Sequence, residues 1–144
     1  MTGLLAEADK ANADFYRANL RAFAERMKEK QREWSAVSLR GRKYVAYHKY
    51  FEYLAAEFGF QLVGYIEPKP GIPPSGAHIE ELIQTMKNAK TSGILVTPAY
   101  GLQEAEFLSA KTGVKVIVLP HDVGSMPGTG DWFSFMDKVI TSLN

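Results

Sequence analysis

Short apolar runs alternate with amphipathic segments over most of the chain. The apolar runs, which predict strands, cover residues 44–47, 61–66, 94–97 and 114–119. Each is followed by a segment whose apolar positions recur at helical spacing. These segments cover residues 50–58, 78–89, 102–111 and 132–143. Gly59 and Gly113 stand where a glycine ends a helix just before the next strand.

Strands that alternate with helices predict a parallel sheet covered by helices on both faces. The first and last runs are almost continuously apolar, as expected of strands buried on both sides. We therefore predict an α/β fold with a four-stranded parallel sheet in the order 2-1-3-4. The crossovers between its strands should be right-handed.

The N-terminal region has a different pattern. Apolar residues recur at helical spacing between charged ones, which predicts one long helix over residues 9–34 with Asp9 as its N-cap. Its apolar positions are Phe15, Tyr16, Leu20, Phe23, Met27 and Trp34. Such a helix either packs as a solvated amphipathic element or is a spacer between two lobes. We therefore divide the chain into a helix at 1–35 and an α/β lobe at 36–144.

The composition of the chain excludes several classes of function. A chain of 144 residues fits one compact α/β domain, and its net charge of +1 gives no general case for nucleic-acid binding. The absence of cysteine excludes thiolate ligands, disulfides and thiol catalysis. No apolar run is long enough to span a membrane. The N-terminal residues also lack the basic and apolar segments of a signal peptide.

Two histidines follow predicted strands at the edge where ligands of such sheets bind. His48 follows the first strand and His121 the fourth. Imidazole is a common ligand of zinc-like ions, and in the order 2-1-3-4 these strands lie roughly 9–10 Å apart. The two side chains could share one ion, with Asp122 as a further ligand or as an acceptor that orients an imidazole. A hydrogen-bonded polar role for each histidine remains open, and these residues do not complete a tetrahedral site.

Other candidate motifs predict structural roles. His78 opens a predicted helix, where capping or contact with the preceding proline-rich loop is the better interpretation. Gly124, Gly128 and Gly130 suggest a phosphate loop, but Asp131 follows where Lys-Ser or Lys-Thr is needed. We interpret this segment as a turn into the last helix.

Several segments together resemble the metal-binding solute-binding proteins, which are the extracytoplasmic receptors of zinc and manganese ABC transporters. Residues 47–54, followed by residues 57–59, are similar to the strand-ligand-helix motif of that family. Residues 66–75 resemble its loop after the next strand, and His78 falls in the usual setting. Residues 12–20 look like the long helix that joins the two lobes of these receptors.

The resemblance implies one ion held between two lobes, with two ligands from each lobe. His48 matches the third ligand position. Aligning Val123-Gly124 with the family's apolar-glycine pair places His121 at the fourth position, and Asp122 is the alternative by one residue. Thr97-Pro98 stands where many members have Glu-Pro. The first lobe and its ligands have no match in this sequence, so the resemblance implies half of a site and weak binding.

We therefore predict the C-terminal lobe of a periplasmic or extracytoplasmic metal receptor, without catalysis. Zinc is favoured over manganese because imidazole outnumbers carboxylate among the candidate ligands. The implied partners are a membrane permease, an N-terminal lobe and a second copy bound through the apolar stripe of the long helix. The alternatives are a flavodoxin-like enzyme with His48 as general base and an interaction module that docks through the long helix. The physiological metal and the oligomeric state stay open.

Overall fold

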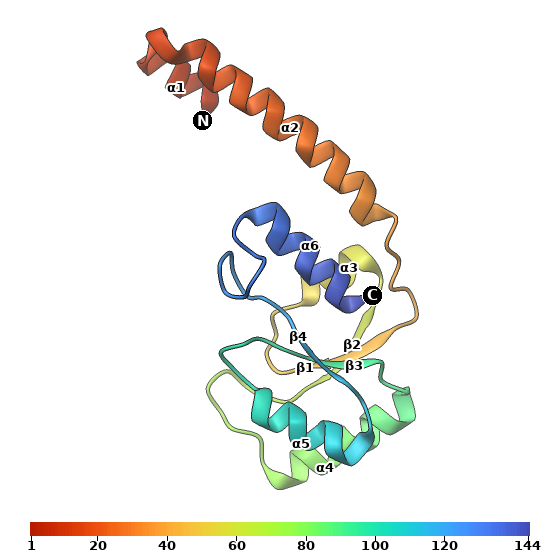
Figure 1. Ribbon diagram of the computed structural model, residues 1–144. Coiled ribbons are helices and arrows are strands. Elements are labelled where there is room, and N and C mark those ends of the chain that lie inside the picture. Colours follow the sequence, from red (N-terminus) through yellow and green to blue (C-terminus); the bar gives the residue numbers. More distant parts are fainter. The chain divides into compact units, whose positions relative to one another are not determined.

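The computed structural model describes all 144 residues, which form two compact units, Met1–Ala36 and Val37–Asn144. The first unit contains α1 (Thr2–Ala8), the 3-10 turn η1 (Lys10–Asn12) and the long helix α2 (Ala13–Ser35) (Figure 1). Within this unit α1 folds back against α2. The long helix agrees with the prediction, whereas α1 was not expected.

The long helix begins at Ala13, so the prediction that Asp9 is its N-cap is wrong. Asp9 ends α1 with φ −126° and ψ 77°, outside helical geometry. Its carboxylate accepts hydrogen bonds from the Asn12 amide and the Tyr16 hydroxyl, both at 2.8 Å. These bonds, that of Asn12 first, hold the pKa of the Asp9 carboxyl below its usual range. Asp9 therefore fixes the turn between α1 and α2.

The second unit is built on four parallel strands. They are β1 (Lys43–Ala46), β2 (Gln61–Tyr65), β3 (Gly93–Val96) and β4 (Val116–Val118). Their order is β2-β1-β3-β4, so the predicted sheet topology is confirmed. The carboxyl ends of all four strands meet at one edge of the sheet.

Helices cover both faces of this sheet, as predicted. The helices are α3 (Glu52–Phe58), α4 (Gly76–Ala89), α5 (Leu102–Thr112) and α6 (Trp132–Leu143). In Figure 1, α4 and α5 lie on one face and α3 and α6 on the other. Gly59 and Gly113 end α3 and α5 in left-handed geometry, with φ of 77° and 74°, as predicted for helix C-caps.

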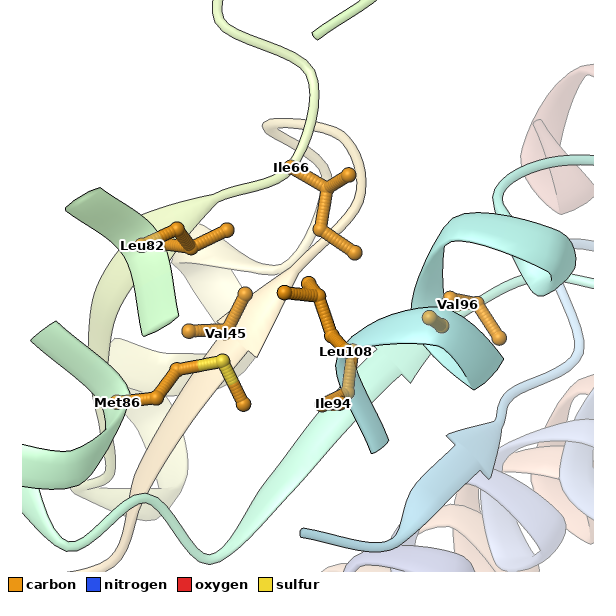
Figure 2. Close-up of a cluster of buried hydrophobic side chains, with 8 residues drawn as sticks. Val45, Ile66, Leu82, Met86, Ile94, Val96 and Leu108 are labelled. Carbon is orange, nitrogen blue, oxygen red and sulfur yellow. The ribbon is translucent and has the colours of Figure 1, made fainter. Parts of the chain in front are cut away.

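The main apolar core lies between the sheet and the α4–α5 layer. Figure 2 shows strand residues facing helix residues across this layer. Its buried members are Val45, Ile66, Leu82, Met86, Ile94, Val96, Ala105 and Leu108. On the other face, the Tyr44 hydroxyl donates to the Leu143 carbonyl at 3.0 Å, which ties the end of α6 to β1. The sheet is thus held rigidly from both sides, which fixes the positions of its strand ends.

None of the helices combines the length and the apolar character that crossing a membrane would require.

Candidate functional site

His48 lies two residues beyond the end of β1, at the carboxyl edge of the sheet. Its ring makes edge-to-face contacts with Tyr47, at 4.6 Å between ring centroids, and with Tyr100, at 5.4 Å. Tyr100 comes from the loop after β3. The His48 side chain keeps 34% of its surface exposed. The imidazole is therefore held by aromatic neighbours and still reaches solvent.

A carboxylate faces the imidazole from the neighbouring strand. Glu67 follows β2, and its Oε2 lies 2.5 Å from Nδ1 of His48. Its Oε1 accepts a hydrogen bond of 2.8 Å from the backbone N–H of Gly71. Only 10% of the Glu67 side chain is exposed. His48, Glu67 and the loop that contains Lys69 and Gly71 line a cavity of about 380 Å³.

The charge state of Glu67 follows from opposing effects. Burial alone raises the pKa of the carboxyl, but the Gly71 N–H and the nearby His48 stabilise the ionised form. The favourable contacts together prevail, and the pKa of Glu67 lies below its usual range. Glu67 is therefore a carboxylate at neutral pH.

Sequence reasoning missed Glu67, although a signal was present. Glu67 follows the second predicted strand as His48 follows the first, and these strands are neighbours in the order 2-1-3-4. The predicted site joined the ends of the first and fourth strands, which have β3 between them. The adjacent strand end was the closer source of a polar partner.

His121 and Asp122 lie on the exposed loop after β4. The Tyr50 hydroxyl donates to the His121 carbonyl at 2.8 Å, which connects this loop to the segment that follows His48. The Ser125 hydroxyl accepts from the backbone N–H groups of both His121 and Asp122 at 3.2 Å. The Asp122 carboxylate accepts from the Val123 N–H at 2.7 Å. The loop is thus ordered by its own hydrogen bonds and by Tyr50.

The structure does not assemble the predicted ligands His48, His121 and Asp122 into one site. It pairs His48 with Glu67, but it gathers no group of three or more His, Cys, Asp or Glu side chains that could hold an ion. Assignment of His121 or Asp122 as a ligand therefore stays a prediction.

The two other motifs have structural roles. The His78 backbone N–H is capped by the Ser75 hydroxyl at 3.2 Å, and its ring Nε2 lies 2.9 Å from the Tyr65 carbonyl. The glycine-containing segment leads into α6 through a capping box formed by Asp131 and Ser134. The contact of His78 with Ser75 of the preceding loop agrees with the sequence interpretation. The turn into the last helix agrees with it as well.

Ligands of open α/β sheets bind outside the carboxyl ends of the strands, and the imidazole of His48 lies at that edge. The sequence model of the ZnuA family, described as "Zinc-uptake complex component A periplasmic", matches residues 1–144. This chain belongs to that family. The resemblance seen in the sequence is thereby confirmed, and neither the flavodoxin-like enzyme nor the interaction module is favoured.

Individual relatives agree with this assignment. The zinc-binding protein AdcA of Streptococcus pyogenes serotype M6 is 25% identical over 145 residues, which cover 96% of this chain and 28% of AdcA. A crystal structure of ZnuA is similar with a TM-score of 0.77 and 26% identity, over 99% of this chain and 53% of that one. The manganese complex of FpvC from Pseudomonas aeruginosa shares the fold, with a TM-score of 0.68 and 24% identity over 99% and 53%. This chain therefore spans about half the length of the solved proteins it matches, and less of AdcA.

Proposed function

We propose that this chain is the C-terminal lobe of a metal receptor that serves an ABC transporter, and that it supplies half of the ion site. The observation that carries this proposal is the position of His48. It stands at the carboxyl edge of the sheet, where its side chain is partly exposed and contacts Glu67 and two aromatic rings. Membership of the family over the full chain supports a receptor function rather than catalysis.

The proposed ion is divalent, and zinc is favoured over manganese. A ZnuA deletion mutant with zinc bound matches this chain with 25% identity and a TM-score of 0.72. Neutral imidazole suits zinc, whereas manganese prefers oxygen ligands. We propose His48 as one ligand and either His121 or Asp122 as the second, since the Tyr50 bond holds their loop at the same edge.

The remaining donors would come from another lobe that closes over this edge. The matched region is about half of ZnuA, which supports a two-lobed arrangement. The proposed partner of the complete receptor is the permease of the transporter, on the periplasmic or extracytoplasmic side of the membrane. A single lobe should bind weakly because it provides few ligands and leaves the ion open to water.

Zinc titration of the wild-type chain and of His48→Ala by calorimetry tests the proposal. We expect weak binding in the wild type and its loss in His48→Ala. His78→Gln is the matched control, because this histidine bonds to the Tyr65 carbonyl and a glutamine amide can replace that bond. The control should bind zinc as the wild type does. Equal affinity in the wild type and His48→Ala would disprove the proposed role.

A further inference from the structure

Glu67 is bonded at both carboxylate oxygens, one to the imidazole of His48 and the other to the backbone of Gly71. We propose that Glu67, held by the proline-rich loop, is a positioning residue that orients His48 for the metal without touching the ion itself. This inference rests on the proposed function, because it concerns the same site.

The proton on the imidazole follows from the chemistry of its partner. An ionised carboxylate can only accept hydrogen bonds, so Nδ1 of His48 must donate to Glu67. In the neutral imidazole the other nitrogen, Nε2, then carries the free lone pair. Metals bind this unprotonated nitrogen, and a carboxylate behind the ring raises its basicity. Glu67 thus selects the tautomer that leaves Nε2 free for a metal.

The loop after β2 holds Glu67 in place. Four prolines restrict its backbone, at positions 68, 70, 73 and 74. The Ile72 N–H donates to the Lys69 carbonyl at 2.9 Å and closes a tight turn. Gly71 has φ 76°, which is the left-handed region, and in this conformation its N–H meets Glu67 Oε1. The loop therefore supplies a fixed donor to the carboxylate.

Aromatic contacts restrict the rotation of the His48 ring. Tyr47 and Tyr100 both meet the imidazole edge-to-face, so rotation of the ring would disturb both contacts. A rotated ring would place Cδ2 where Nδ1 stands and would break the hydrogen bond to Glu67. The bond to Glu67 and the packing of the two tyrosines thus favour the same orientation of the His48 ring. This orientation does not require a bound metal.

The test compares Glu67→Ala with Glu67→Gln in the full chain. Zinc affinity is measured from the side-chain NMR signals of His48, and the tautomer from its nitrogen shifts at mildly alkaline pH without metal. The chain has three histidines, so the signals can be assigned by substitution. Glu52→Ala is the matched control, because Glu52 is an exposed carboxylate that bonds to Tyr65 instead of His48.

We expect the wild type to show His48 with the proton on Nδ1. Glu67→Ala should mix the tautomers and weaken zinc binding about 10–100-fold, the usual effect of removing such a partner. Glu67→Gln should restore the tautomer and most of the affinity, because its amide oxygen can accept the same hydrogen bond. The control should match the wild type in both measurements.

Two outcomes would overturn the inference while the proposed function stands. In the first, Glu67→Ala keeps both the tautomer and the affinity of the wild type. In the second, Glu67→Gln keeps the tautomer but loses as much affinity as His48→Ala, which would make Glu67 a ligand. Unchanged affinity in His48→Ala is a separate result, which rejects the proposed function itself.

Discussion

At the scale of single residues, the site depends on the backbone conformation of Gly71. Its φ of 76° lies in a region that other residues enter at a cost of roughly 1–2 kcal/mol. We predict that Gly71→Ala weakens zinc binding several-fold, because relaxation of the loop moves the N–H away from Glu67. The measurement is the same zinc titration as for the His48 variants.

Gly113→Ala is the control for this prediction. Gly113 has a similar φ of 74° and, like Gly71, has open space around the added methyl group. It ends α5, at the opposite end of that helix from the carboxyl edge of the sheet. Gly113→Ala should lose a comparable amount of stability in urea unfolding and keep its zinc affinity. Equal losses of affinity in both variants would argue against the role of Gly71.

The residue scale also shows which part of the site the sequence could predict. His48 was predicted as a site residue because it follows an apolar run. The sequence can show this because the position of a residue along one strand is a local property. The predicted pairing of β1 with β2 brings the ends of these strands together, but the bonding of Glu67 also depends on a loop that turns back at Gly71. No periodicity in the sequence encodes such a contact. The choice between His121 and Asp122 depends on a donor set from another lobe, so it stays a prediction.

At the scale of elements, sequence patterns predicted every strand but not every boundary. The fourth run was expected over residues 114–119, whereas β4 is Val116–Val118. This strand pairs with β3 alone, and the Val114 N–H is bonded to the Thr112 hydroxyl at the helix end instead. The helix α1 was missed because its seven residues are too few to show a helical period, and its stability depends on packing against α2. Boundaries and short elements thus depend on tertiary contacts.

The turn between α1 and α2 should respond to pH through Asp9. The pKa of Asp9 is lowered in the folded state, by the bond from Asn12 first and then by that from Tyr16. Its contribution to stability is therefore present above the unfolded pKa and is lost as pH falls through the folded value. We predict that acid weakens the packing of α1 in the wild type and that Asp9→Asn removes this pH dependence. Amide hydrogen exchange of α1 at several pH values measures the effect.

Asp14→Asn is the matched control for Asp9→Asn. Asp14 lies in the first turn of α2 and pairs with Arg17 at 3.2 Å on an exposed surface. Exposed pairs of this kind contribute about 0–1 kcal/mol, so the variant should keep the acid response of the wild type. An acid response that persists in Asp9→Asn would show that another group controls the turn.

At the scale of the whole molecule, the long helix α2 presents an exposed surface that could bind another protein. No residue of α2 is buried, and large apolar side chains stand exposed along it. Phe15, Leu20 and Phe23 are 62%, 50% and 50% exposed. Large exposed apolar surfaces favour association with another surface.

We predict that the chain alone associates through α2, because burial of these side chains is favourable at about 25 cal/mol per Å². Sedimentation over a range of concentrations should show a monomer–dimer equilibrium in the wild type. Phe15→Glu combined with Leu20→Glu should shift it to monomer, since carboxylates are costly to bury without partners. Tyr53→Glu is the control, because Tyr53 is 93% exposed on α3 and outside the N-terminal unit. If the double variant associates as strongly as the wild type, or if Tyr53→Glu alone abolishes association, the surface of α2 is not the contact.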